Sequence, residues 1–381
     1  MRRLFVVIVM FCAFTLPAQQ PQRYIDSLQQ KINAETNEGL RLEMQATLLL
    51  KYYTTGSTAR ALSIYHAAIK QATGPNNQKA RAMLLHTRGV IFYYESRFDS
   101  ALVYFERALE IRTRITDNEG VLKSTSNIGS IYYMMGNYKK ALHYYEIGQK
   151  KESELHYPEG ECISINNLGY IHHSLKLHDI ALSYFRKAEK IYTSQKKFAE
   201  LVYTCDGLFN VYADLKQTDS AMKYAGRSKT LALQQGELAS AAYSYLNMAL
   251  CCMEQKKFAE ASRLLDSSET TAAPLNDKRL QLAVAGNRAA IELRLNRPDS
   301  ALRYMDKIVS LRNQLSIKNE NKDLAELFAR YYLMKKDFEK AFHYYEIFDR
   351  YKDSIYNADI TAQVSEMRTR FESEKKEKEN M

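Results

Sequence analysis

Tryptophan is absent from this 381-residue sequence, and glycine, proline and cysteine are scarce, with 14, 6 and 5 copies. The few glycines form no phosphate-binding loop, and neither a His-Glu-x-x-His zinc motif nor a nucleophile elbow occurs. The 44 acidic residues are scattered along the chain, as they are on a solvated surface. We therefore expect no enzymatic activity, no metal and no cofactor.

Long hydrophobic runs are also missing, with one exception at the amino terminus. The basic start, the apolar run from Leu4 to Phe14 and the small-residue end at Ala18 are the three parts of a secretory signal peptide, so we expect cleavage of residues 1–18. The run is shorter than the roughly 20 residues of a spanning helix, which disfavours an uncleaved anchor. Phe11 is too bulky for lipoprotein processing at Cys12. The mature protein is therefore expected in the periplasm or outside the cell.

The charge balance has no concentrated basic stretch. The formal net charge is +10, and loss of the two arginines in residues 1–18 leaves +8, spread over the chain. A diffuse excess mainly affects solubility, whereas a nucleic-acid binder carries a clustered basic face. We expect no nucleic-acid partner.

An alanine recurs at one constant interval along most of the chain. The eight copies are Ala61, Ala101, Ala141, Ala181, Ala221, Ala261, Ala301 and Ala341. Around Ala141, Gly129 and Tyr132 precede a turn at Gly136, and Tyr145 and Gly148 follow at helical spacing. This pattern predicts two amphipathic helices folded back on each other, with small residues where the backbones approach. A period of about 40 residues predicts stacked hairpins, and so one elongated solenoid.

The period divides the chain into four predicted parts. These are a signal peptide (1–18), an amphipathic capping helix (22–40), eight repeats (42–361) and a charged C-terminal helix (362–381). The prolines fit this division, because Pro75, Pro158 and Pro274 fall between repeats and Pro298 falls in a turn. Six tyrosines follow the repeat alanine by three positions, which predicts packing rather than a ligand surface. They are Tyr104, Tyr144, Tyr184, Tyr224, Tyr304 and Tyr344.

Four cysteines remain in the expected mature chain: Cys162, Cys205, Cys251 and Cys252. An even count in an oxidising compartment permits disulfides, but the spacing shows no small disulfide framework. Cys205 and Cys252 fall at repeat positions that are expected to be core, so we interpret them as buried thiols. The sequence leaves open whether any of the four are paired.

The repeat resembles the tetratricopeptide repeat. That family has a small residue in the first helix, an aromatic three positions later, and Ala-x-x-x-aromatic-x-x-small in the second helix, as Gly129, Tyr132, Ala141, Tyr145 and Gly148 do here. The resemblance implies an all-α solenoid wound as a right-handed superhelix. The period exceeds the family's usual one of about 34 residues. In this it is similar to the long-repeat subgroup of bacterial peptide-responsive regulators, and we expect the added residues to lengthen the helices and the inter-repeat loops. HEAT repeats have a similar length but lack the register of small and aromatic residues.

In the resembled fold the first helix of each pair lines a concave groove. Positions 2, 6, 9 and 13 of each unit share one face of that helix. Position 6 holds four asparagines, whose amides match both polar groups of a peptide bond. We predict that they bind an extended peptide, with three tyrosines adding apolar contact; the alternative is that they bond to neighbouring helices. The predicted site is Asn127, Asn167, Asn247, Asn287, Tyr170, Tyr203 and Tyr243.

A cluster of three histidines, His172, His173 and His178, raises the question of a metal site. His172 and His178 occupy repeat positions that are aromatic elsewhere, and no cysteine or carboxylate lies near them at ligand spacing. We therefore expect no metal there.

These observations favour a non-enzymatic exported scaffold that binds a protein or an extended peptide segment in its groove. The alternative is a periplasmic ligand-sensing module of a bacterial signalling protein, whose membrane and output parts are absent from this chain. The secretory start and the tyrosine-rich repeats also resemble the exported sensor half of such signalling proteins. This resemblance implies association with a membrane-bound signalling partner. The sequence indicates neither the partner nor an oligomeric state.

Overall fold

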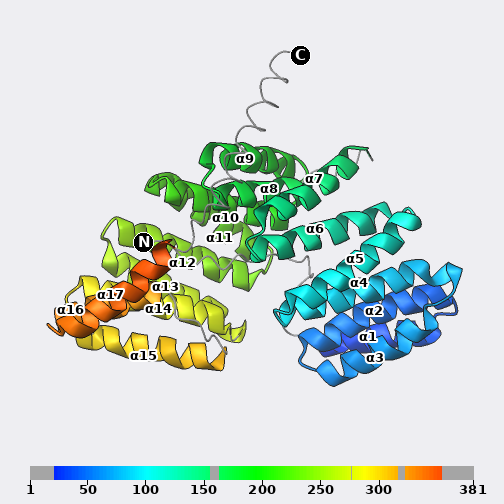
Figure 1. Cartoon of the computed structure of the whole chain (residues 1–381), viewed down its shortest axis with the longest axis horizontal. Helices are drawn as coiled ribbons and strands as arrows, with labels where there is room; N and C mark the ends of the chain where they lie inside the picture. The colour runs from blue at the N-terminus through cyan, green and yellow to red at the C-terminus, as the bar shows by residue number, and fades with distance from the viewer. Residues whose placement is uncertain (1–20, 155–162, 276, 316–321, 354–381) are drawn as a thin grey trace, which may run out of the picture. The chain divides into compact units, whose positions relative to one another are not determined.

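A computed structural model describes residues 21–154, 163–275, 277–315 and 322–353, which form α-helices and short links without a strand (Figure 1). One compact unit ends at Ile171 and a second begins at His172. The helices are α1 (Pro21–Ala34), α2 (Glu38–Thr54), α3 (Thr58–Gln71), α4 (Gln78–Tyr94), α5 (Phe98–Arg114), α6 (Asn118–Met134), α7 (Tyr138–Glu154), α8 (Ile163–Ser174), α9 (His178–Ser194), α10 (Phe198–Asp214), α11 (Thr218–Gln234), α12 (Leu238–Glu254), α13 (Phe258–Ala272), α14 (Lys278–Arg294), α15 (Pro298–Gln314), α16 (Lys322–Met334) and α17 (Phe338–Asp353). Two 3₁₀ turns, Pro75–Asn77 and Ala273–Leu275, precede α4 and α14.

Each sequence repeat consists of two helices of similar length. From α2 onward the helices pair as hairpins, α2 with α3 through to α16 with α17. Both helices of the pair α4 and α5 have 17 residues, as do both of the pair α6 and α7. The expectation of longer inter-repeat loops is wrong at 115–117, 195–197 and 235–237, where the link between repeats is as short as the link within one. At these joints the added residues lengthen the helices alone. The all-α repeat architecture is confirmed.

The repeat alanines lie where the helices cross. All eight are buried, and the most exposed of them, Ala341, is 9 % exposed. Glycine is required opposite some of the aromatics, because a Cβ at Gly129 would lie 2.6 Å from the Tyr145 ring and one at Gly89 would lie 2.9 Å from the Phe105 ring. Small residues therefore set the close approach of the two helices in a hairpin.

The periodic tyrosines pack inside the hairpins, as predicted. Tyr144 stacks on Tyr132 with ring centroids 5.7 Å apart, and Tyr224 stacks on Tyr212 at 5.5 Å. His172 takes the aromatic position in its repeat and stacks on Tyr184 at 5.3 Å. These contacts join the last turn of a first helix to the first turns of its second helix.

Cys205 and Cys252 are buried, which confirms their interpretation as core residues, and Cys251 is buried as well. Cys162, the signal peptide and the charged helix over 362–381 lie outside the described residues. In the described part, no helix combines the length and the apolar character that crossing a membrane requires. The helix predicted over 22–40 corresponds to α1, which buries Ile25, Leu28 and Ile32, and to the start of α2.

Candidate binding face of the first helices

The candidate site is the first-helix face, defined as the side chains at positions 2, 6, 9 and 13 of each repeat unit. On α6 and α8 the predicted asparagines reach the preceding repeat. Asn127 is 8 % exposed, and its amide nitrogen lies 3.1 Å from Nε2 of His86. Asn167 Nδ2 donates to Ser126 Oγ at 3.3 Å. Both contacts join residues one repeat apart, so these two amides bridge successive first helices, which is the alternative role considered for them.

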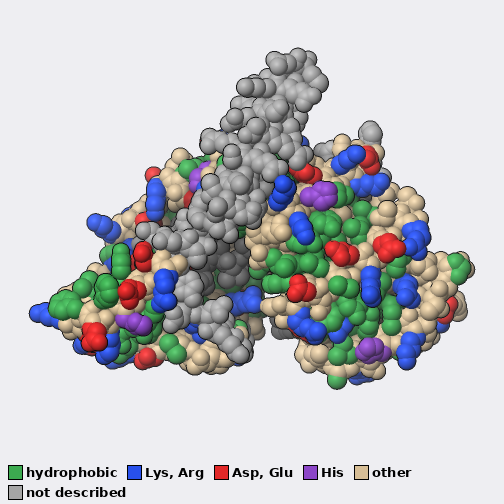
Figure 2. Space-filling view, in the orientation of Figure 1, with side chains coloured by type: hydrophobic (Ala, Val, Ile, Leu, Met, Phe, Trp, Pro, Cys, Tyr) green, Lys and Arg blue, Asp and Glu red, His purple; other side chains and the backbone are tan. Residues whose placement is uncertain are grey.

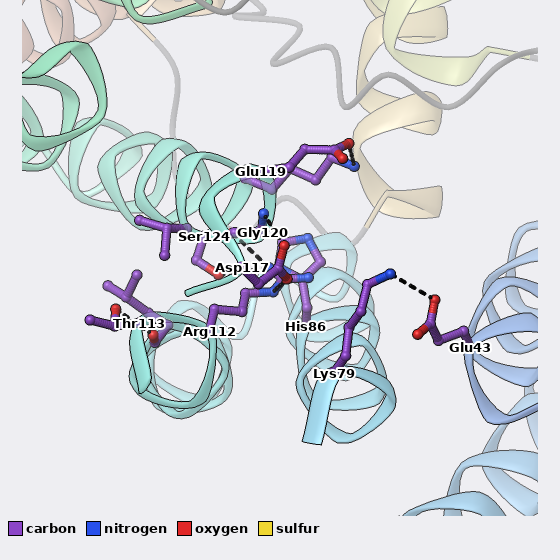
Figure 3. Close-up of polar contacts among 12 residues, drawn as sticks. Glu43, Lys79, His86, Arg112, Thr113, Asp117, Glu119, Gly120 and Ser124 are labelled. Atoms are coloured by element: carbon purple, nitrogen blue, oxygen red, sulfur yellow. Dashed lines mark hydrogen bonds and ion pairs between the residues drawn. The ribbon is translucent and has the colours of Figure 1, made fainter. Parts of the chain in front are cut away.

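A buried arginine organises this joint. Arg112, in the last turn of α5, is 3 % exposed, and its Nη1 lies 2.8 Å from Ser124 Oγ and 3.0 Å from both the Gly120 carbonyl oxygen and His86 Nδ1 (Figure 3). Its Nε lies 3.6 Å from Oδ2 of Asp117. Asp117 also accepts a hydrogen bond from the Gly120 backbone N–H, which caps α6. The cation is therefore compensated by a carboxylate and several acceptors.

The arginine also determines the protonation of His86. Arginine can only donate, so Nδ1 of His86 is the acceptor and the neutral ring carries its proton on Nε2. Burial and then the charge of Arg112 lower the pKa of His86 well below its usual range, so the ring stays neutral. The other ring nitrogen, Nε2, lies 3.1 Å from Nδ2 of Asn127, so the His86 ring joins Arg112 to Asn127. Asn127 is therefore a buried structural contact between α4 and α6.

The asparagines of α12 and α14 are more exposed than Asn127 and make fewer hydrogen bonds to other helices. Asn247 and Asn287 are both partly exposed. Asn287 Nδ2 donates to the Ala283 carbonyl oxygen at 2.8 Å within its own helix. Asn247 makes no hydrogen bond to any described residue. Within the described part of the chain, neither amide bonds to a neighbouring helix, in contrast to Asn127 and Asn167.

The three predicted tyrosines differ in their exposure. Tyr170 is buried at 7 % exposure, while Tyr203 on α10 and Tyr243 on α12 are partly exposed. The Tyr243 hydroxyl donates to Asp277 Oδ2 at 3.3 Å, and Asp277 caps α14. Burial and the Asp277 charge raise the pKa of Tyr243 above its ordinary value. Tyr243 therefore presents a neutral ring held against the next repeat.

Surface charge on the visible face is mixed. Figure 2 shows lysine and arginine interspersed with aspartate and glutamate and with hydrophobic side chains, rather than a field of one sign. This distribution fits the diffuse charge seen in the sequence.

Comparisons with known proteins agree with the geometry. Two models of the tetratricopeptide repeat family match, one over residues 80–146 and one over residues 164–195. The fold is similar to that of a Rap protein complexed with competence and sporulation factor, with a TM-score of 0.62 at 13 % identity, covering 90 % of this chain and 92 % of that one. The chain is a tetratricopeptide repeat protein.

Two further solved structures share the tetratricopeptide repeat fold of this chain. Aspartyl phosphate phosphatase F from Bacillus subtilis gives a TM-score of 0.62 at 16 % identity, covering 87 % of this chain and 88 % of that one. The apo form of the quorum sensor NprR from B. thuringiensis gives 0.61 at 14 % identity, covering 86 % and 92 %. No curated protein sequence matches the chain. At these identities the likeness shows the fold, and the tetratricopeptide repeat fold supports a protein-binding scaffold.

Arg112 of this tetratricopeptide repeat protein was missed in the sequence, and the histidine cluster was considered without its companion Asp214. Arg112 occupies a buried repeat position that is alanine at Ala72, Ala232 and Ala272 but Glu152, Tyr192 and Arg312 in other repeats. Because this position is apolar in some repeats and charged in others, the repeat pattern did not identify Arg112. His173, His178 and Asp214 form a group whose ligand atoms all lie within 4.8 Å of one another. Asp214 stands one repeat beyond His173, at the same offset that separates His86 and Asn127.

Proposed function

We propose that this tetratricopeptide repeat chain is a non-catalytic exported scaffold that holds a protein segment or an extended peptide against the first-helix face of α10, α12 and α14. The observation that carries the proposal is the equivalent pair Asn247 and Asn287, which is partly exposed and bonded to no neighbouring helix among the described residues. An amide offers an acceptor and two donors, so each can pair with both polar groups of one peptide unit. Tyr203 and Tyr243 add partly exposed aromatic surface to the same face.

The amides at Asn127 and Asn167 take no part in this proposal as ligand contacts. Their bonds to His86 and Ser126 hold adjacent repeats together. Removing them is expected to cost stability, because a buried partner would lose its hydrogen bond. The binding role is therefore narrowed from four asparagines to two.

Affinity capture tests the proposal. The chain is immobilised and exposed to cell-envelope extract of its source, and bound proteins are identified and then titrated as purified segments. The double variant N247A/N287A is expected to weaken binding of the captured segment at least about tenfold, because two hydrogen bonds of about 1 kcal/mol each are lost. N313A, an exposed asparagine on the second helix α15, is the matched control and should bind like wild type. Equal binding by the double variant would refute the proposed face.

The exported location rests on residues 1–18. Mass spectrometry of the protein isolated from its source, with cell fractionation, tests it. A mature chain that begins at Gln19 in the envelope or medium is the expected result. A full-length chain in the cytoplasm would contradict it.

A second candidate is a ligand-sensing module associated with a membrane-bound signalling partner. The observation that favours it is the likeness to a protein named a quorum sensor. The two candidates differ in their consequence, because a sensor must pass occupancy to an output. Co-purification of a membrane-bound kinase or transcription regulator that is released or retained according to ligand would favour the sensor.

A further inference from the structure

We propose that His173, His178 and Asp214 form a binding site for a divalent transition-metal ion of the Zn²⁺ type. The site lies where the turn between α8 and α9 meets the end of α10. Two imidazoles and one carboxylate are a common ligand set for Zn²⁺, with a fourth position left for water or a partner's side chain. The proposal is independent of the peptide-binding role.

The distances suit a small tetrahedral site. Nε2 of His173 lies 3.2 Å from Oδ2 of Asp214. Ligand bonds of about 2.0–2.2 Å at tetrahedral angles place two ligand atoms roughly 3.4 Å apart, so this pair already has the required spacing. The third ligand atom, on His178, lies within 4.8 Å of both. The two rings are 5.8 Å apart between centroids.

The site is partly enclosed and carries an unsatisfied nitrogen. His173 is 5 % exposed, and His178 and Asp214 are partly buried. Nδ1 of His178 is buried and has no hydrogen-bond partner among the described residues. A buried imidazole nitrogen without a hydrogen-bond partner is destabilising unless something binds it. A metal ion would bind this nitrogen, and His173 and Asp214 can bind the same ion.

A ligating nitrogen must present its lone pair to the metal. On metal binding, the proton that His173 Nε2 donates to Asp214 therefore moves to Nδ1 or to solvent.

Lys176 competes for this site. Its Nζ lies 2.5 Å from Oδ2 of Asp214, and its side chain is 33 % exposed. The ammonium group stands where the metal would contact Asp214, and the partly exposed side chain has room to turn toward solvent. Metal binding therefore exchanges one cation for another on Asp214. It would link the turn after α8 to the end of α10 and raise the stability of this joint.

Isothermal titration of untagged chain with ZnCl₂ after treatment with EDTA and its removal tests the site. We expect one Zn²⁺ per chain and a raised Tm. H178A and D214N should each weaken binding at least about tenfold, since even the loss of an outer contact to a ligand costs about 10–100-fold. K176M should tighten binding about five- to tenfold by removing the competing charge. Replacement of Zn²⁺ by Co²⁺ should give the intense visible absorption of a tetrahedral site.

Matched controls separate the site from general effects. K216M changes a lysine at the equivalent turn one repeat later, with the same positive φ, and should leave Zn²⁺ affinity unchanged. H343A removes an exposed histidine of α17 and should also have no effect. The proposal is overturned if wild type binds no Zn²⁺, or if H178A and D214N, both shown to be folded by circular dichroism, bind it like wild type. Unchanged affinity in K176M would overturn the displacement of Lys176.

Discussion

Asp206 has a carboxyl whose charge state changes near neutral pH. It lies on α10, partly buried, and accepts a hydrogen bond from Ser228 Oγ of α11 at 2.8 Å. Burial raises its pKa to about 7, and the Ser228 bond offsets only part of this effect. No cation is bonded to it in the described part of the chain, unlike Asp214, where Lys176 holds the charge. The two carboxylates of one helix therefore respond oppositely to their surroundings.

The raised pKa of Asp206 predicts that the protein loses stability as pH rises. In the unfolded chain the pKa of aspartate is about 3.9, so between about pH 4 and pH 7 the folded state binds more protons than the unfolded state. The free energy of unfolding should therefore fall across this window and level off above it. D206N should remove this part of the slope, measured by urea denaturation at several pH values, while D306N, an exposed carboxylate on α15, should keep it. An unchanged slope in D206N would contradict the assignment.

The repeat was predictable from residues, but the polar contacts were not. The repeat alanines are visible in the sequence because each hairpin needs a small residue where its two helices cross, as Ala141 and Gly129 show. The role of Asn127 depends instead on His86 in the preceding repeat, and no pattern within one unit reveals that pairing. For the same reason Asp214 was not recognised as a companion of His173.

At the scale of the helix, every helix from α2 onward that is followed by a described three-residue link ends in the same way. The middle residue of the link takes a left-handed conformation, as in Lys256, whose N–H donates to the Met253 carbonyl oxygen while Lys257 N–H donates to that of Cys252. This pair of bonds is a Schellman motif. Glycine fills the left-handed position at Gly56, Gly136 and Gly236, whereas lysine, serine, threonine or asparagine fills the others. The half-repeat spacing of these three-residue turns was not recognised in the sequence, because only three of them carry glycine.

Lysine at a left-handed position is strained, and glycine there should be stabilising. Lys256 has a φ of 59°, which costs a residue with a Cβ about 1 kcal/mol or more. K256G removes this cost but gains flexibility in the unfolded chain worth about 0.5 kcal/mol. We expect a net gain of about 0.5–1 kcal/mol in urea denaturation. The neighbour Lys257, with a φ of −83°, is the control, and K257G should be neutral or destabilising. Equal effects of both changes would contradict the conformational argument.

At the scale of the molecule, each hairpin is stabilised by its neighbours. In the unit that begins at His172, α11 packs against both α10 and α12. By contrast, among the described residues α17 packs mainly against α16, and its Phe338, Phe342 and Tyr345 are exposed at 65, 64 and 56 %. In a repeat array, stability is the sum of each unit's own stability and its interfaces. A helix with fewer interfaces should therefore open more often.

Hydrogen exchange tests this expectation. Amides of α17 should exchange at least about tenfold faster than those of α11 under native conditions, because opening α17 breaks fewer buried contacts. The repeat alanines also predict less protection for α17 than for α11, since Ala341 of α17 is 9 % exposed and Ala221 of α11 is 1 % exposed. Both helices belong to the compact unit that begins at His172, so the expected difference in exchange does not depend on the other unit. Mass spectrometry of peptides spanning 218–234 and 338–353 measures it. Equal protection of the two peptides would mean that α17 gains interfaces beyond its contact with α16, and the expectation would be wrong.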